Sequence, residues 1–422
     1  MRTIESAMHS KYMIVGSSHA ALEAATAIRL IDADGALTLL TRDAHLPYSP
    51  TILPYVVSGR SQPDNVVLRS QAYFNDNAIA FVPGATVVSI DPVQSSLHLA
   101  SGETRQYDRL LIATGAAPML PPVHGLIDVP FHVLRSMDDA INLRQAMGKV
   151  RSAIVLGAGL IGMHAVENMA KAKIAVTVVE LQPHALSGYF EPRASAIIER
   201  TFARNGVRML MGQTLRSVER QGEGCLATLA DGKTIAADLL LVCTGVKPNI
   251  GFLNGSGIEV DAGILVDDLM RTNLPNIWAA GDVAQTRGFW GGKVVNGILP
   301  NAVEQGRIAG LGMADDEGVT PFAGAVPLNT YSFFGQQAIS VGRGSTGSGF
   351  EIEDSSDEAD GVYRHIVLKD GQLVGIATIN DFVDAGIMWQ LILRGTDLSS
   401  VKAEFIANPQ LTGRQLMSQI WR

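Results

Sequence analysis

The chain has 422 residues, 47% of them hydrophobic, a length typical of two or three domains with more than one core. Its net charge of −8 argues against a nucleic-acid-binding protein, and no apolar run approaches the roughly 18 residues of a membrane-spanning helix. The two cysteines, Cys225 and Cys243, are too few and too far apart for a redox dithiol, a zinc site or a protein-ligated iron–sulfur cluster. We expect a cytoplasmic protein with reduced thiols, no metal site and no signal peptide.

The first predicted unit is a β-α-β unit near the N-terminus. A strand over residues 12–15 leads into a turn, a helix over residues 22–31 and a second strand over residues 36–40. The turn has the sequence Gly16-Ser17-Ser18-His19-Ala20-Ala21. It is a degenerate form of the glycine-rich turn that binds a dinucleotide, because a serine replaces the second glycine. Alone, the pattern is equally compatible with an ordinary β-α-β unit.

The position expected to bind the ribose in this first unit holds no acid. Thr41 stands there, 25 residues after Gly16, and whether Arg42 compensates is open. Further along, the apolar strand within residues 107–118 ends in Ala113-Thr114-Gly115, a tight turn.

The second β-α-β unit carries the strongest signal in the chain. A strand over residues 152–156 precedes Gly157-Ala158-Gly159-Leu160-Ile161-Gly162, a helix and a strand over residues 176–179. The first glycine permits the tight turn, the second leaves room for a pyrophosphate, and the third lets helix and strand pack closely. Glu180 lies 23 residues after Gly157, where it would accept from a ribose 2′-hydroxyl and repel a 2′-phosphate. This favours NAD(H) over NADP(H); the alternative is a glycine-rich turn beside a solvated glutamate.

The two halves repeat one plan. Residues 237–248 form a second strand ending in a Thr-Gly turn, at Thr244 and Gly245. We call each glycine-rich turn a fingerprint. The first glycine of the fingerprint and the glycine of the Thr-Gly turn are 99 residues apart (16 to 115) in one half and 88 (157 to 245) in the other. Short alternating strands lie between these points in each half, so two nucleotide-binding domains of one construction are predicted.

The C-terminal part shows a different pattern of predicted elements. A strand leads into Gly281-Asp282, and a helix is predicted over residues 302–313. Beyond about residue 326 we predict antiparallel strands, a helix over residues 382–393 and a mobile surface loop over residues 344–361. The predicted fold class is α/β, with two doubly wound dinucleotide-binding domains (FAD and NAD) and an α+β C-terminal interface domain.

Together these motifs resemble the FAD-dependent pyridine nucleotide-disulfide oxidoreductases, nearest to the ferredoxin and rubredoxin reductases and NADH oxidases. The resemblance covers nearly the whole chain. It implies an FAD domain (1–118 and 249–325) interrupted by an NAD domain (119–248) and followed by an interface domain (326–422). Hydride would then pass between nicotinamide and flavin.

The resemblance also assigns cofactor-binding residues, position by position. The pyrophosphate of FAD would lie at Gly16, Ser18 and His19, its nucleotide at Thr114 and Gly115, and its ribityl chain at Asp282. The complete set expected at FAD is Gly16, Ser17, Ser18, His19, Ala20, Thr41, Arg42, Pro50, Val87, Ala113, Thr114, Gly115, Gly281, Asp282 and Pro300. The set expected at NAD is Gly157, Ala158, Gly159, Leu160, Ile161, Gly162, Glu180 and Gly245.

A narrower resemblance lies in residues 1–12, 43–50, 162–165 and 417–422. These segments are similar to the FAD-bearing, NAD-reducing subunits of 2-oxoacid:acceptor oxidoreductase complexes. The resemblance implies partner subunits that carry thiamine diphosphate and iron–sulfur clusters, with electrons passing from the clusters through FAD to NAD+. It implies no nucleic-acid and no membrane partner.

Two positions depart from the family pattern. Thr51 stands where disulfide and peroxide reductases have a redox cysteine, and its hydroxyl cannot form a disulfide or a sulfenic acid. His164 replaces a common acid shortly after the last fingerprint glycine. It could lie near the nicotinamide and flavin as a candidate catalytic residue, or could pack on the helix face.

Three alternatives share these motifs: a stand-alone NADH:ferredoxin or rubredoxin reductase, an assembly subunit with a vestigial flavin, and an NADH oxidase that uses O2. Two aromatic segments, residues 288–293 and 331–334 with Trp389, could dock a partner or form buried packing.

Overall fold

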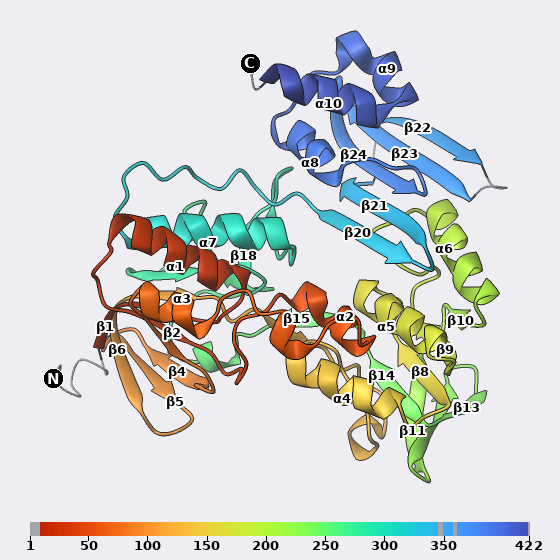
Figure 1. Ribbon diagram of the computed structural model, residues 1–422, viewed down its shortest axis with the longest axis horizontal. Coiled ribbons are helices and arrows are strands. Elements are labelled where there is room, and N and C mark those ends of the chain that lie inside the picture. The colour runs from red at the N-terminus through yellow and green to blue at the C-terminus, as the bar shows by residue number, and fades with distance from the viewer. Residues whose placement is uncertain (1–8, 345–348, 358–360, 421–422) are drawn as a thin grey trace.

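The computed structural model describes residues 9–344, 349–357 and 361–420. Expectations for residues 1–8, 421 and 422, and for residues 345–348 and 358–360 of the predicted loop, lie outside this part of the chain. The described chain has three main sheets, two of them flanked by helices and one in the C-terminal part, together with three smaller sheets (Figure 1). The predicted fold class is confirmed, while the domain limits at residues 118, 248 and 325 stay predictions. Among the described helices, none has the length and apolar character needed to cross a bilayer.

The first sheet has seven strands in the order β3-β2-β1-β6-β5-β4, with β17 on β6. Strands β3, β2, β1, β6 and β17 run parallel, whereas β5 and β4 are antiparallel. The strands are β1 (His9–Val15), β2 (Leu37–Leu40), β3 (Ile79–Val82), β4 (Val87–Asp91), β5 (Ser96–Leu99), β6 (Thr104–Ile112) and β17 (Ile277–Ala279). The flanking helices are α1 (His19–Ile31), α3 (Gln71–Asp76) and α7 (Leu299–Met313). The short helix α2 (Leu53–Val57) instead packs into the hydrophobic core of the second half.

The second sheet is parallel throughout, in the order β10-β9-β8-β14. Residues of β14 are all buried because a parallel sheet is covered on both faces. Its elements are β8 (Ser152–Leu156), α5 (Leu160–Lys171), β9 (Ala175–Glu180), α6 (Pro192–Arg204), β10 (Arg208–Met211) and β14 (Leu239–Val242), preceded by α4 (Met137–Met147). A three-stranded meander lies beside it: β11 (Leu215–Gln221), β12 (Gly224–Leu229) and β13 (Thr234–Ala237).

A two-stranded ribbon joins the two halves. It pairs β7 (Ala116–Pro118) with β15 (Val246–Pro248), which are the segments directly after the two Thr-Gly turns. The chain thus crosses between the sheets twice, side by side. Three short strands, β16 (Ile264–Leu265), β18 (Ala284–Arg287) and β19 (Lys293–Val294), flank the return to β17.

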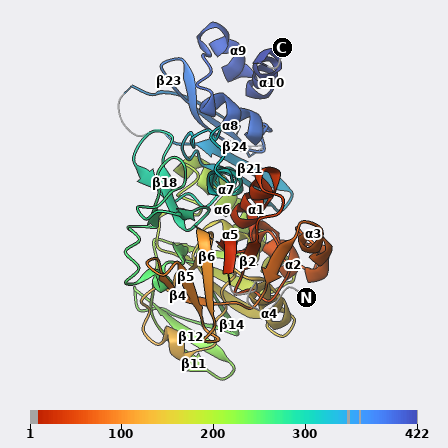
Figure 2. The ribbon, with the colours of Figure 1, turned by 90° about the vertical axis from the view of Figure 1, so that its left-hand side faces the viewer.

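The C-terminal domain lies at one end of the molecule, as Figure 1 and Figure 2 both show. Its five-stranded sheet has the order β20-β21-β24-β23-β22. The elements are β20 (Leu328–Phe333), β21 (Gln336–Gly342), β22 (Glu351–Asp357), β23 (Val362–Lys369), β24 (Gln372–Ile379), α8 (Ala385–Leu393), α9 (Lys402–Ala407) and α10 (Pro409–Ile420).

The prediction of a loop over residues 344–361 is wrong for β22. All seven of its residues pair with β23, although all seven side chains are exposed. The strand is therefore held by backbone hydrogen bonds at the sheet edge, and no apolar alternation marks it.

The aromatic residues of β20 are core, not surface. Tyr331 and Phe333 are almost completely buried, and they stack with ring centroids 5.2 Å apart. Phe333 also stacks on Phe202 of α6, at 6.1 Å. Buried packing, the second of the two interpretations, is confirmed for these two residues.

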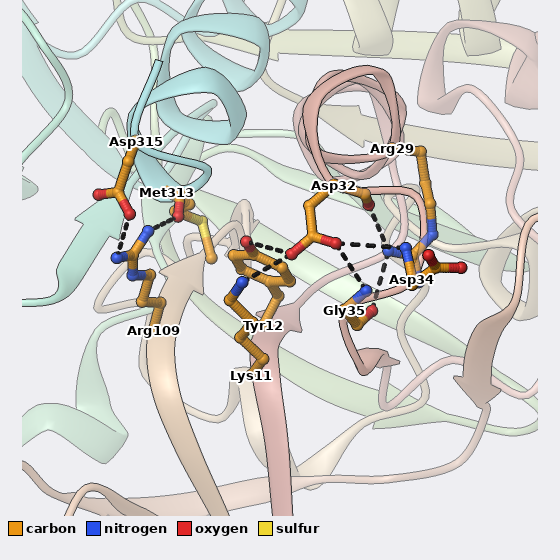
Figure 3. Close-up of polar contacts among 9 residues, drawn as sticks. All are labelled: Lys11, Tyr12, Arg29, Asp32, Asp34, Gly35, Arg109, Met313 and Asp315. Atoms are coloured by element: carbon orange, nitrogen blue, oxygen red, sulfur yellow. Dashed lines mark hydrogen bonds and ion pairs between the residues drawn. The ribbon is translucent and has the colours of Figure 1, made fainter. Parts of the chain in front are cut away.

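Asp32 closes the loop between α1 and β2 (Figure 3). Its carboxylate accepts from Lys11 Nζ at 2.7 Å, from Tyr12 Oη at 2.9 Å and from the Gly35 amide at 2.7 Å. The hydrogen bond from Lys11 is the main cause that holds the pKa of Asp32 far below its ordinary value. Arg29 donates to the backbone carbonyls of Asp32 and Gly35, so the loop is fixed from both sides.

We expect Asp32→Asn to lower the free energy of unfolding by about 1–2 kcal/mol at pH 7, because charged hydrogen bonds are lost. The folded-state pKa lies below the unfolded value of about 3.9, so this stabilisation is present above that pH and is lost as the pH falls below it. Urea unfolding of both proteins at pH 7 and below pH 4 checks this. A difference that grows on acidification would contradict it.

Candidate functional site

The first glycine of each fingerprint lies against the strand that ends in the matching Thr-Gly turn. A Cβ atom at Gly16 would lie 2.1 Å from the carbonyl oxygen of Ala113, and one at Gly157 would lie 2.3 Å from that of Cys243. Both glycines have positive φ, +129° and +105°. The two turns therefore have the same geometry at the carboxyl edge of their sheets, where doubly wound folds bind nucleotides.

The turn before α1 leaves backbone amides available for an anion. Ser18 is the N-cap of α1, and its hydroxyl makes no capping bond. Ser17 Oγ instead donates to Thr41 Oγ1 at 3.1 Å, so the residue in the acid's position anchors the turn. His19 Nε2 lies 2.8 Å from Ser49 Oγ, beside Pro50, and burial lowers the His19 pKa. His19 is the first residue of α1, where the free backbone amides of a helix N-terminus favour an anion such as a pyrophosphate.

The Gly281-Asp282 segment lies beside the same turn. A Cβ atom at Gly281 would lie 3.2 Å from Cβ of Ala20. Asp282 pairs with Arg135, whose Nη2 lies 2.8 Å from the carboxylate and whose Nε donates to the Ala116 carbonyl. Arg135 was missed from the sequence, because a lone arginine 147 residues from its partner leaves no local pattern.

The N-terminus of α7 has polar groups in need of a partner. Asn301 is almost fully buried, yet neither atom of its amide finds a partner in the described part of the chain. Pro300 precedes it in the first turn. Because the flavin ring of FAD has a polar edge with donors and acceptors, this orphaned amide fits that cofactor.

The remaining residues assigned to FAD are more peripheral. Val87 is the first residue of β4, two residues after Ala85, whose amide donates to the Thr41 carbonyl at 2.7 Å. Arg42 is exposed next to Thr41. Their contact with a nucleotide stays a prediction.

The second fingerprint is held by Glu180 itself. Glu180 accepts from the Ala158 amide at 2.6 Å and from the Gln182 amide at 2.7 Å. Gly159 is the N-cap of α5, and a Cβ there would meet no atom within 4 Å. Gly162 is tight, because its Cβ would lie 2.4 Å from the Gly157 carbonyl oxygen. The carboxylate, the open second glycine and the start of α5, with Leu160 and Ile161, thus meet at one edge.

The first Thr-Gly turn is hydrogen-bonded to Asn249, which follows the second Thr-Gly turn in the chain. Thr114 Oγ1 donates to the Asn249 carbonyl at 3.0 Å, and Asn249 Nδ2 donates back to the Thr114 carbonyl at 2.8 Å. The Asn249 amide also donates to the Gly115 carbonyl, at 2.9 Å. Asn249 therefore fixes the turn that is expected to line the flavin nucleotide, from the far end of the inserted segment.

His164 lies at the boundary with the C-terminal domain. Its ring meets Tyr331 edge to face, with centroids 4.7 Å apart, and burial lowers its pKa. Burial also raises the Tyr331 pKa, and its hydroxyl has no partner among the described residues. The structure places His164 in an aromatic contact; its role as a catalytic residue stays a prediction.

The two thiols lie in apolar surroundings. Burial raises the pKa of Cys243 to about 12 and also raises that of Cys225. We expect iodoacetamide at pH 8 to leave both unmodified over an hour and NADH oxidation unchanged, because the thiolate is the reactive form. Intact-mass spectrometry checks this, with urea-unfolded protein as the positive control. Rapid alkylation of the folded chain would show that one thiol is activated.

Comparison with known proteins gives a consistent result. The family model described as pyridine nucleotide-disulphide oxidoreductase matches residues 10–306. The NADH-dependent phenylglyoxylate dehydrogenase subunit epsilon of Aromatoleum evansii is 51% identical, over 98% of this chain and 99% of the relative. The rubredoxin-NAD(+) reductase of Pseudomonas putida is 30% identical, over 70% and 78%. A ferredoxin reductase structure from Rhodopseudomonas palustris matches with a TM-score of 0.80 and 29% identity, over 88% and 91% of the two chains.

Proposed function

The chain belongs to the pyridine nucleotide-disulphide oxidoreductase family, and it is an oxidoreductase that binds FAD and NAD(H). From this we propose its place in a larger enzyme. It is the flavin subunit of a 2-oxoacid oxidoreductase complex in the cytoplasm, with phenylglyoxylate as the oxoacid. The overall reaction converts phenylglyoxylate, CoA and NAD+ to benzoyl-CoA, CO2 and NADH. The observation that carries the proposal is the 51% identity over almost the full length of a relative of that name.

The residues of this chain bind and align the two nucleotides. The start of α1, Asp282 and the first turn of α7 hold FAD, and the start of α5 with Glu180 holds NAD(H). When bound, FAD exchanges a hydride with the nicotinamide and single electrons with one-electron carriers.

The proposal assigns the oxoacid chemistry to partner subunits. Two cysteines are too few to ligate an iron–sulfur cluster, so the electrons have to cross a protein interface. The partners therefore carry thiamine diphosphate, which acts on the oxoacid, and the iron–sulfur clusters that deliver electrons to this flavin.

Anaerobic titration of the purified chain with NADH, and separately with NADPH, tests the flavin step. We expect NADH to bleach the flavin absorption band and NADPH to do so only at far higher concentration, because Glu180 repels a 2′-phosphate. Co-purification of the tagged chain with iron–sulfur subunits then tests the complex. If no flavin copurifies, an assembly subunit with a vestigial flavin becomes the better explanation.

A stand-alone reductase is the second candidate, favoured by the rubredoxin-NAD(+) reductase relative. Such an enzyme would reduce a purified rubredoxin or ferredoxin with NADH in the absence of other subunits. Rapid oxygen consumption with NADH alone would instead indicate an NADH oxidase.

Thr51→Ala is expected to change NADH oxidation by ferricyanide less than about twofold, as for most exposed substitutions. Thr51 is exposed, and its hydroxyl lies 2.7 Å from Ser49 Oγ without a redox function. Steady-state assays of both proteins at equal flavin content check this. A loss of more than tenfold would show that the hydroxyl takes part in the reaction.

A further inference from the structure

Several exposed apolar side chains gather at the carboxyl edge of the parallel NAD sheet. Ile161 follows β8, Leu181 follows β9 directly, and Val246 follows the Thr-Gly turn after β14, with exposed fractions of 39%, 66% and 54%. Met119, from the linking ribbon, is 44% exposed. Single exposed apolar residues are ordinary, but four at one edge of a sheet, on its loops and at the start of α5, indicate a surface that a ligand covers.

Met119 is fixed to this edge by its backbone. Its amide donates to the Gly245 carbonyl at 2.9 Å, and its carbonyl accepts from Thr244 Oγ1 at 2.7 Å. Its Cε lies 3.6 Å from the position that a Cβ of Gly245 would take. The side chain thus lies over the turn, while the residue belongs to the segment that arrives from the other half of the molecule.

The turn under Met119 touches the fingerprint. A Cβ at Gly157 would lie 2.3 Å from the Cys243 carbonyl oxygen and 3.2 Å from the Thr244 amide. Gly162 is also close, because its Cβ would lie 3.3 Å from Cβ of Cys243. Met119 therefore contacts a turn that itself packs against the glycines expected to approach the pyrophosphate.

Strand order decides which half of the dinucleotide reaches Met119. The order β10-β9-β8-β14 reverses between β8 and β14, and a dinucleotide lies across such a reversal. The adenosine ribose is on the β9 side with Glu180, and the pyrophosphate is at the turn after β8. The other nucleotide then lies on the β14 side.

We propose that Met119, with Val246, forms the apolar wall that contacts the nicotinamide half of NAD(H). This inference rests on the proposed NAD site at residues 157–162 and Glu180. A thioether side chain on a backbone-anchored turn supplies adaptable apolar contact without a hydrogen bond of its own. The FAD-side linker thereby contributes directly to the binding of the second nucleotide.

The test uses the flavin-loaded, oxidised protein and calorimetric binding of NAD+ and of ADP-ribose, which lacks the nicotinamide. Met119→Ala keeps both hydrogen bonds of the Met119 backbone and removes only the thioether side chain from the wall. We expect about tenfold weaker NAD+ binding, as for loss of roughly two buried methylene groups, and less than twofold change for ADP-ribose. Met119→Leu restores the affinity for NAD+, and Val93→Ala, at an exposed site on the β4–β5 turn, changes neither ligand.

The outcomes separate this inference from the site on which it rests. Unchanged NAD+ binding in Met119→Ala, or an equal loss of both ligands, overturns the proposed contact. Glu180→Ala serves as the reference and should weaken both ligands. If Glu180→Ala changes neither, the NAD site itself is misplaced and the inference falls with it.

Discussion

Gly157→Ala is expected to lower the free energy of unfolding by about 2–5 kcal/mol, the sum of a strained backbone and an overpacked contact. Gly157 has φ of +105°, and its new Cβ would lie 2.3 Å from the Cys243 carbonyl oxygen. That oxygen belongs to the backbone directly after β14, where the Cys243 amide is hydrogen-bonded to the Leu156 carbonyl of β8, so it cannot move aside cheaply. Urea unfolding with tryptophan fluorescence measures the effect.

Gly159→Ala is the matched control, with the same added methyl group two residues along. No atom lies within 4 Å of its Cβ position, and Gly159 does not have positive φ. We expect this variant to unfold like the unchanged protein but to bind NADH at least tenfold more weakly, because the methyl group points where the pyrophosphate must approach. Equal stability of both variants would contradict the geometry assigned to this turn.

Glu180→Ala is expected to weaken NADH binding by about 10–100-fold, the loss of charge-assisted hydrogen bonds to a ribose. The flavin content should stay unchanged, since Glu180 belongs to the second sheet. Part of the loss is conformational, because the variant leaves the buried Ala158 amide without its acceptor at 2.6 Å.

Glu180→Gln separates the two contributions to that loss. It keeps an oxygen for the Ala158 amide and removes the charge, so it should retain stability while its preference for NADH over NADPH falls. Binding titrations with both nucleotides measure this preference. Equal loss of FAD and NADH in Glu180→Ala would show that the assignment of the two nucleotide sites is wrong.

The sequence predicted the parallel sheets well because their strands are apolar and their turns carry glycine. The starts of helices were less accurate: α1 begins at His19, directly after its N-cap Ser18, and α7 begins at Leu299, with Pro300 in its first turn. The start of each helix is marked by a polar or proline residue, and a search for apolar residues repeating every 3.6 positions does not detect such residues. Strand β22 was missed for the related reason that all its side chains are exposed, so its sequence shows no apolar alternation.

The fingerprints and Glu180 could be found from spacing because each lies within one β-α-β unit. Arg135, Asn249 and Met119 could not. Their contacts with Asp282, Thr114 and Thr244 join residues 147, 135 and 125 positions apart. Such pairs arise only when the chain has crossed between the sheets and returned, and local sequence carries no record of that.

The pairing of β17 with β6 also fixes the order in which the molecule can be completed. Leu110 can form this pair only after Ile277, its partner 167 residues later, has been synthesised. The four strands of the second sheet, in contrast, come from one continuous stretch, residues 152–242. Closing a long loop is slower than forming a local unit. During synthesis we therefore expect the inserted sheet to fold first, and the flavin to be captured only after the chain has returned. A ribosome stalled before residue 277 would hold a nascent chain that can bind NAD(H) but cannot yet retain FAD.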